Sequence, residues 1–144
     1  MPTYTVTVAN LSLSPQQKSQ IAEAITAAHN AQTGAPRFFA QVLFSAANEG
    51  NHFVGGRANT APQVYVVHGL VREGRSIEIK QALMSQMLKE IAQILDITAE
   101  DVWIYLQDIP ATQMIEFGRF LPAPGDEIEW QKRMSPEKRG SLPK

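Results

Sequence analysis

The chain has 144 residues, of which 44% are apolar, and its net charge at pH 7 is −1. This length suits one domain over residues 1–144, long enough to bury roughly 68% of the unfolded chain's surface. The near-neutral charge argues against a nucleic-acid footprint or a polybasic membrane surface, and no run approaches the roughly 18 apolar residues of a membrane span. The absence of cysteine excludes disulfides and thiolate sites and fits a reducing compartment, for which we expect the cytoplasm.

The first part of the chain predicts a strand, a helix and a second strand. Residues 2–8 (PTYTVTV) alternate and are rich in β-branched side chains, which is typical of a strand. Residues 14–17 (SPQQ) form a capping box with proline at the first helical position, and Gly34 ends the helix. Residues 38–44 (FFAQVLF) predict the second strand.

The same order recurs after a polar, glycine-rich stretch at residues 48–63. Residues 64–70 (VYVVHGL) predict a strand, and residues 102–107 (VWIYLQ) predict another. The helix between them begins at Ser76 and has one apolar stripe, made by Ile79, Leu83, Met87, Ile91 and Ile94.

These elements form a β-α-β unit used twice, over residues 2–47 and 63–108. A crossover helix joins two parallel strands and covers one face, so two units predict an α+β fold with a four-stranded sheet and both helices on one face. The recurrence is one of order and length, so a chance arrangement is the alternative to duplication. The other face needs a cover, for which self-association is the candidate. Residues 118–144 predict a loop and a charged tail that frays.

Two arginines lie where the second predicted helix begins. Arg72 and Arg75, in REGRS, flank a helix N-terminus with its unpaired N–H groups. Guanidinium groups bind carboxylate or phosphate in a bidentate manner, so the motif predicts an anion site. The alternative is a pair of solvated surface arginines.

Other candidate residues are ordinary when taken singly. His29 lies near the end of the first helix, where the helix dipole favours a cationic imidazole, although a core histidine is the alternative. Tyr105 lies in a predicted strand, where a tyrosine usually packs. Glu116 lies in a predicted turn, where a glutamate is usually solvated. Pro2 is tolerated at the start of a strand, but removal of Met1 would leave it with a free secondary amine. No metal-ligand spacing is present, so we expect no metal.

Six polar positions, in matching order and spacing over nearly the whole chain, resemble the tautomerase superfamily and, within it, the cis-3-chloroacrylic acid dehalogenase group: Pro2, His29, Arg72 and Arg75 in REGR, Tyr105 in WIYLQDIP, and Glu116 in QMIEFGRFLP. The resemblance thins in residues 48–63 and in the last dozen residues. It implies a homotrimer of tautomerase-like subunits with a mixed sheet and with Pro2 at the floor of a small pocket.

The resemblance also implies roles for these residues. The substrate carboxylate would be held by His29, Arg72 and Arg75, and catalysis would fall to Pro2, Glu116 and Tyr105, the tyrosine coming from the same or a neighbouring subunit. The implied reaction is the cofactor-independent hydration of a short 2,3-unsaturated carboxylate, such as cis-3-haloacrylate converted to malonate semialdehyde, with Pro2 as general acid. The alternatives are keto–enol tautomerisation with Pro2 as general base, and a non-catalytic trimeric binding module.

Overall fold

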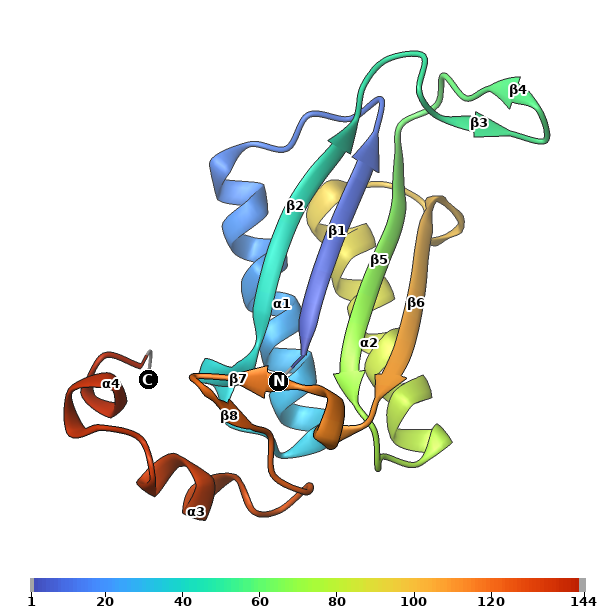
Figure 1. The fold of residues 1–144 in the computed structure, drawn as a ribbon. Coiled ribbons are helices and arrows are strands. Elements are labelled where there is room, and N and C mark those ends of the chain that lie inside the picture. Colours follow the sequence, from blue (N-terminus) through green and yellow to red (C-terminus); the bar gives the residue numbers. More distant parts are fainter. Residues whose placement is uncertain (1, 143–144) are drawn as a thin grey trace.

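The computed structural model describes residues 2–142 and is built on one four-stranded mixed sheet (Figure 1). The strand order is β2-β1-β5-β6, from β1 (Thr3–Ala9), β2 (Gln41–Ala47), β5 (Gln63–Arg72) and β6 (Val102–Ile109). β1 is parallel to β2, β5 is parallel to β6, and β1 and β5 are antiparallel. The predicted tandem β-α-β arrangement is confirmed. Met1 and the last two residues lie outside the described residues. Our expectations on the removal of Met1 and on the C-terminal tail refer in part to these residues.

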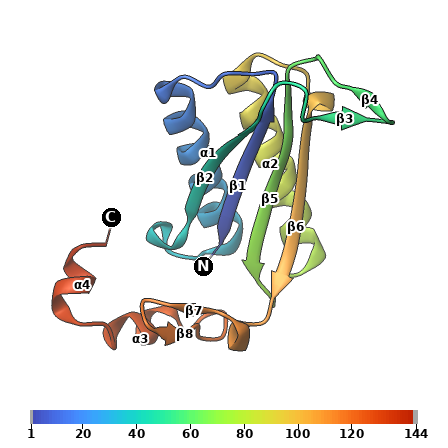
Figure 2. The ribbon, with the colours of Figure 1, turned by 45° about the horizontal axis from the view of Figure 1, so that its top comes forward.

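Two long helices lie side by side on one face of this sheet (Figures 1 and 2). In α1 (Pro15–Thr33), Ser14 and Gln17 form the predicted capping box, and Gly34 ends the helix in the left-handed conformation. In α2 (Ile77–Leu95), the side chain of Ser76 caps the first turn. The main core lies between the helices and the sheet, and its largest fully buried side chains include Tyr4, Ile21, Ile25, Leu83, Met87 and Ile91.

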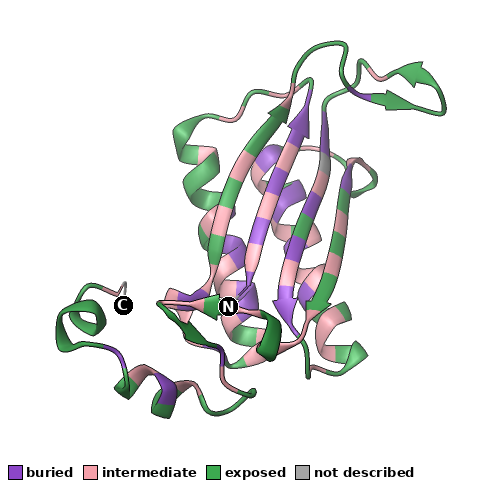
Figure 3. Cartoon of the chain, viewed as in Figure 1, coloured by how far each residue is buried: buried purple, intermediate pink, exposed green. Residues whose placement is uncertain are grey.

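The opposite face of the sheet carries side chains that the single chain leaves open (Figure 3). Leu43 on β2, and Trp103 and Tyr105 on β6, are 48%, 38% and 57% exposed. Burial of apolar area of this kind is favourable. The face is therefore available for contact with a further chain.

A small hairpin lies within the polar, glycine-rich stretch at residues 48–63, for which we predicted no strand. β3 (Phe53–Val54) pairs with β4 (Arg57–Ala58) and projects beyond the end of the sheet (Figure 1). Gly55 and Gly56, with φ of 58° and 78°, form the turn, a backbone conformation that glycine adopts without strain. The two-residue strands are too short to give an alternating pattern.

The C-terminal segment is more ordered than predicted. It contains one short 3₁₀ turn (Ala111–Gln113) and the hairpin of β7 (Ile115–Glu116) and β8 (Arg119–Phe120), followed by α3 (Glu127–Lys132) and α4 (Pro136–Gly140). Apolar side chains of this segment pack against Phe39 to form a second core, which contains Phe39, Leu121, Trp130 and Met134. Phe39 comes from a 3₁₀ turn at Arg37–Phe39, which delays the start of β2 beyond the predicted position. Figure 2 shows this segment lying across the end of the sheet where β1 begins and β5 ends.

Candidate active site

A narrow pocket lies where the C-terminal segment crosses the end of the sheet. Its polar lining comes from Pro2, His29, Arg72, Arg75 and Glu127, and apolar side chains close the remainder. The interior volume of about 10 Å³ is roughly what a single water molecule requires. The enclosed part of the pocket in the single chain is therefore small.

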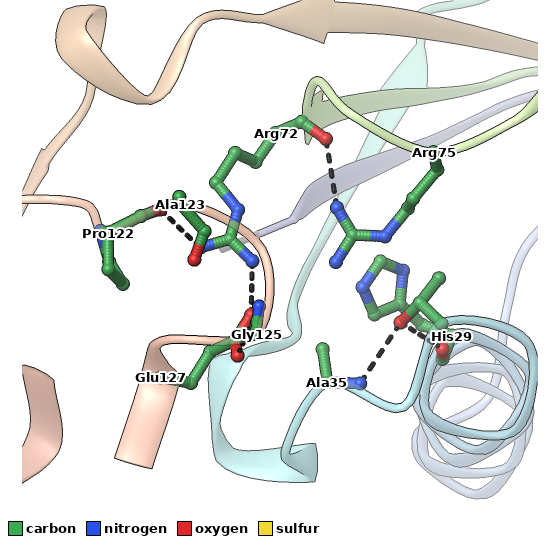
Figure 4. A network of polar contacts seen from close by, with 9 residues as sticks. His29, Ala35, Arg72, Arg75, Pro122, Ala123, Gly125 and Glu127 are labelled. Atoms are coloured by element: carbon green, nitrogen blue, oxygen red, sulfur yellow. Dashed lines mark hydrogen bonds and ion pairs between the residues drawn. The ribbon is translucent and has the colours of Figure 1, made fainter. Parts of the chain in front are cut away.

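Arg72 connects the sheet to the C-terminal segment. It is the last residue of β5 and is 6% exposed, which excludes for this residue the alternative of a solvated surface arginine. Its Nη1 donates a hydrogen bond to the carbonyl oxygen of Pro122 at 2.6 Å, and its Nη2 pairs with the carboxylate of Glu127 (Figure 4). Glu127 also accepts a hydrogen bond from the backbone N–H of Gly125 at 2.9 Å. These bonds hold the pocket wall against the sheet.

Arg75 lies in the turn between β5 and α2, and its guanidinium group faces the ring of His29 (Figure 4). Its Nη1 donates a hydrogen bond to the backbone carbonyl oxygen of Arg72 at 2.9 Å. Burial, followed by the nearby charge of Arg72, lowers the pKa of Arg75. A guanidinium group keeps its proton in proteins, so Arg75 supplies a positive charge to the pocket.

His29 is a buried, neutral histidine near the end of α1. It is 2% exposed, and its Nδ1 lies 2.8 Å from the hydroxyl oxygen of Tyr4. Burial lowers the pKa of His29 to about 3, with further contributions from Arg75, the amino terminus and Arg72. Of the two readings that the sequence allowed, the burial of His29 favours the core histidine over the cationic imidazole, because the helix dipole contributes only about 0.3 to 1 kcal/mol and desolvation beside two arginines outweighs it.

Three buried nitrogen atoms around this pocket have no hydrogen-bond partner among residues 2–142: Nε2 of His29, Nε of Arg72 and Nε of Arg75. A buried polar atom without a partner costs about 1 to 3 kcal/mol. All three residues line the same pocket, so an acceptor bound there would have several donors nearby. The chemistry of this arrangement fits a small anion, and a carboxylate in particular.

Glu116 lies beside the pocket rather than in its wall. It is on β7 and lines an adjoining cavity together with Thr3, which follows Pro2 in the chain, and Phe39, which lines both cavities. Burial raises the pKa of the Glu116 carboxyl, whereas the positive charges of the amino terminus and Arg72 oppose this rise. The carboxylate is therefore within electrostatic reach of the pocket and is more basic than a solvated glutamate.

Tyr105 is not brought to this pocket within one chain. It lies on β6, on the open face of the sheet, opposite His68 in the β5–β6 register. An exposed side chain on that face can reach a pocket only in a neighbouring copy. Its assignment to the site therefore stays a prediction that depends on assembly.

Two polar residues of the site, Tyr4 and Glu127, were not predicted from the sequence. The alternation of residues 2–8 places Tyr4 on the buried face of its strand, but no local pattern pairs it with a histidine 25 positions later. Glu127 belongs to a charged stretch that we predicted to fray, and nothing in the local sequence distinguishes it from Glu129.

A search of the described residues finds no helix long and apolar enough to cross a membrane. The same part of the chain holds no group of three or more histidine, aspartate or glutamate side chains placed to bind a metal ion.

Paired β-α-β units, with a proline-lined pocket at the end of their shared sheet, define a protein of the tautomerase fold. A family model described as a putative oxalocrotonate tautomerase enzyme matches residues 1–135. The chain belongs to this family, and hence to the tautomerase superfamily, whose members are enzymes. No curated protein matches the sequence.

Solved structures of the superfamily are similar along most of the chain. N1, a member of the cis-3-chloroacrylic acid dehalogenase family, is 28% identical, with a TM-score of 0.84 and 97% of each chain covered. The F6 fused 4-OT, solved as an asymmetric trimer, is 26% identical, with a TM-score of 0.72 over 84% of this chain and 98% of its own. Pt0534, inactivated by 2-oxo-3-pentynoate, is 25% identical, with a TM-score of 0.71 over 83% of this chain and 94% of its own.

Proposed function

We propose that this protein hydrates short 2,3-unsaturated carboxylates without a cofactor, converting cis-3-haloacrylate to malonate semialdehyde. The observation that carries the proposal is the set of buried donors on His29, Arg72 and Arg75 around a pocket that Pro2 also lines. A carboxylate would satisfy these donors. Similarity to a member of the cis-3-chloroacrylic acid dehalogenase family over 97% of the chain supports the choice of reaction.

The pocket would activate the double bond through the carboxylate. An ionised carboxylate donates electron density to C2 and C3, which makes C3 a poor target for water. Pairing it with Arg72 and Arg75 in a site that excludes bulk water withdraws that density and stabilises the negative charge that develops during addition. His29 would provide a further hydrogen bond without adding a third positive charge.

Addition of water then requires one base and one acid. Glu116 takes a proton from water, the water oxygen bonds to C3, and the protonated amine of Pro2 delivers a proton to C2. When C3 carries a halogen, the resulting halohydrin loses halide and its hydroxyl proton, giving the three-carbon aldehyde acid. The proton released in that step restores the amine of Pro2, and the proton on Glu116 returns to solvent.

The charges in the site favour Glu116 as the base and Pro2 as the acid. The negative charge of Glu116 favours a protonated amine at Pro2, which suits the role of acid. The raised pKa of Glu116 makes it a stronger base than a solvated glutamate. The mechanism requires Pro2 to be the amino-terminal residue, because an amide nitrogen has no basicity, so active protein should lack Met1 by intact-mass analysis.

We further propose that the protein is a cytoplasmic homotrimer in which Tyr105 of one subunit completes the site of another. Exposed Leu43, Trp103 and Tyr105 on the open face of the sheet support an assembly, and a fused 4-OT that is 26% identical was solved as a trimer. In this arrangement Tyr105 would help Glu116 to position the attacking water.

A second candidate is keto–enol tautomerisation with neutral Pro2 as base. The positive charges of Arg72 and Arg75 near the amino terminus favour it, because they disfavour a protonated amine. The third reading is a binding module without turnover. We place it last because its buried polar groups would carry a desolvation penalty that recognition alone does not require.

The test is to incubate the protein separately with cis-3-haloacrylate, trans-3-haloacrylate, propiolate and an arylpyruvate enol, and to follow the products by proton NMR. We expect turnover of the cis isomer and of propiolate. A cis substituent keeps the molecule folded within the pocket, whereas a trans halogen points away from it. Preference for the trans isomer, or turnover of the enol alone, overturns the assignment and favours the tautomerase.

A further inference from the structure

We propose that Tyr4 is a positioning residue that fixes His29 in the tautomer with its proton on Nε2, so that an imidazole N–H group points into the pocket. The identity of the ligand that receives this hydrogen bond, a carboxylate, rests on the proposed function. The tautomer itself rests only on the contacts around Tyr4.

The two side chains meet in the interior of the protein. Tyr4 is 0% exposed and His29 is 2% exposed, and they reach each other from β1 and α1. The hydroxyl oxygen of Tyr4 lies 2.8 Å from Nδ1 of His29, with the ring centroids 5.9 Å apart and the rings inclined at 68°. Their hydrogen bond is thus shielded from water, where it is stronger than at a surface.

The direction of this hydrogen bond follows from which of the two groups has a hydrogen to donate and which can accept it. Burial raises the pKa of Tyr4, so the phenol keeps its hydrogen. Within the part of the chain that the structure describes, the only hydrogen-bond partner of that hydroxyl is Nδ1 of His29. When the hydroxyl donates, Nδ1 accepts, and a neutral imidazole then carries its proton on Nε2.

The opposite tautomer would leave two groups mismatched. A proton on Nδ1 would use the tyrosine oxygen as acceptor, and the hydroxyl hydrogen would have no acceptor in the core. Nε2 would then present a lone pair to the pocket and repel the oxygen atoms of a carboxylate, which accept hydrogen bonds and donate none. With the proton on Nε2, His29 joins Nε of Arg72 and Nε of Arg75 as a third donor.

Gly69 supplies the space that holds the tyrosine ring in place. It lies opposite Tyr4 in the β1–β5 register. A Cβ atom at position 69 would lie 2.6 Å from Cε1 of Tyr4 and 2.6 Å from Cδ2 of Leu106, closer than packed atoms approach. The ring therefore fills the place of a missing side chain, which fixes the position of the hydroxyl group relative to α1.

The tautomer can be read directly from the nitrogen chemical shifts of ¹⁵N-histidine-labelled full-length protein without ligand. The chain has three histidines, so His52 and His68 are internal controls in the same spectrum. In the wild type we expect a protonated Nε2 and an unprotonated Nδ1 for His29. In Tyr4→Phe we expect His29 to show a mixture of the two tautomers or the opposite tautomer. The nitrogen chemical shifts of His52 and His68 should stay the same.

Thr7→Val is the matched variant, because it removes a hydroxyl group from β1 that bonds Ser45 instead of His29. It should leave the His29 signals unchanged. Propionate, a saturated carboxylate that cannot be hydrated, should shift the Nε2 signal of the wild type. With a substrate, Tyr4→Phe should lower kcat/KM by about threefold to tenfold, mainly through KM.

A wild-type protein with its proton on Nδ1 would overturn the proposal even if Tyr4→Phe failed to fold. So would an unchanged Nε2 proton in folded Tyr4→Phe. A Nε2 signal that propionate does not move would contradict carboxylate binding at His29 and so the proposed function. The expected tautomer and propionate response in a protein that hydrates no unsaturated acid would instead contradict the proposed function and leave the role of Tyr4 standing.

Discussion

Arg72, at the end of β5, forms an ion pair with Glu127, the first residue of α3, across 55 positions of sequence. The two side chains are 6% and 14% exposed. Hydrogen bonding and charge from Arg72 hold the pKa of Glu127 below its usual value, against the opposing effect of burial. One of the two arginines of the candidate site is therefore already engaged by the protein itself, and the two should respond differently to mutation.

Replacement of Arg72 by alanine should destabilise the protein by about 1 to 3 kcal/mol, because it removes a charge-assisted hydrogen bond and leaves the partly buried carboxylate of Glu127 without its partner. Urea unfolding of Arg72→Ala measures this change. Arg37→Ala is the matched control, since Arg37 and Glu23 form an ion pair with 38% and 64% exposure, and exposed pairs contribute about 1 kcal/mol or less. Equal small losses in both variants would mean that the buried pair does not hold the C-terminal segment.

Replacement of Arg75 by alanine should lower kcat/KM by roughly tenfold to a hundredfold, because it removes a charge-assisted hydrogen bond worth about 1.5 to 3 kcal/mol. Its effect on unfolding should be smaller than that of Arg72→Ala, since among the described residues its guanidinium group bonds one backbone carbonyl and no carboxylate. Steady-state kinetics with cis-3-haloacrylate are the measurement. Arg57→Ala, in the exposed β4, is the control; equal activities in the two variants would contradict carboxylate binding by Arg75.

Glu116→Gln keeps the shape of the side chain but removes the base and its negative charge. Hydration should fall by about 10² to 10⁴, whereas tautomerisation by neutral Pro2 should persist or increase. The two activities are measured on the same preparation with propiolate and an arylpyruvate enol. Glu129→Gln, on the exposed surface of α3, should change neither, and equal loss of both activities in Glu116→Gln would argue against a separate role in hydration.

Stability should depend on pH through His29. Its pKa is lowered from 6.5 to about 3, so between these pH values the unfolded chain binds a proton that the folded chain does not. The free energy of unfolding therefore decreases as the pH falls through this window, by about 2 kcal/mol between pH 7 and pH 5. The lowered pKa of Glu127 also decreases the free energy of unfolding as the pH falls, but only at lower pH. The raised pKa of Glu116 has the opposite effect and partly offsets the decrease caused by His29.

Urea unfolding at the two pH values measures this dependence. His29→Asn should remove most of it, whereas His68→Gln, which changes an exposed histidine on the open sheet face, should preserve it. Equal pH dependence from pH 7 to pH 5 in the wild type and in His29→Asn would contradict a neutral His29 in the folded protein.

Local signals allowed much of the fold to be predicted. The capping box at Ser14 and Gln17 and the left-handed Gly34 are set by neighbouring residues, so they could be recognised without knowledge of the fold. The contacts of Tyr4 with His29 and of Arg72 with Glu127 could not, because each joins residues that only the tertiary structure brings together. Trp130 illustrates the same limit, since it is buried against Phe39 within a stretch whose charged neighbours predict exposure.

The second core has a consequence for how the pocket is filled. The wall at residues 121–127 is anchored by Arg72 on one side and by Trp130 on the other, where the indole Nε1 donates a hydrogen bond to the carbonyl oxygen of Phe120 at 2.8 Å. This second core is separate from the main core between the sheet and the long helices. Loss of an aromatic contact around Trp130 should therefore alter the shape of the pocket, and with it the choice of substrate, without unfolding the sheet.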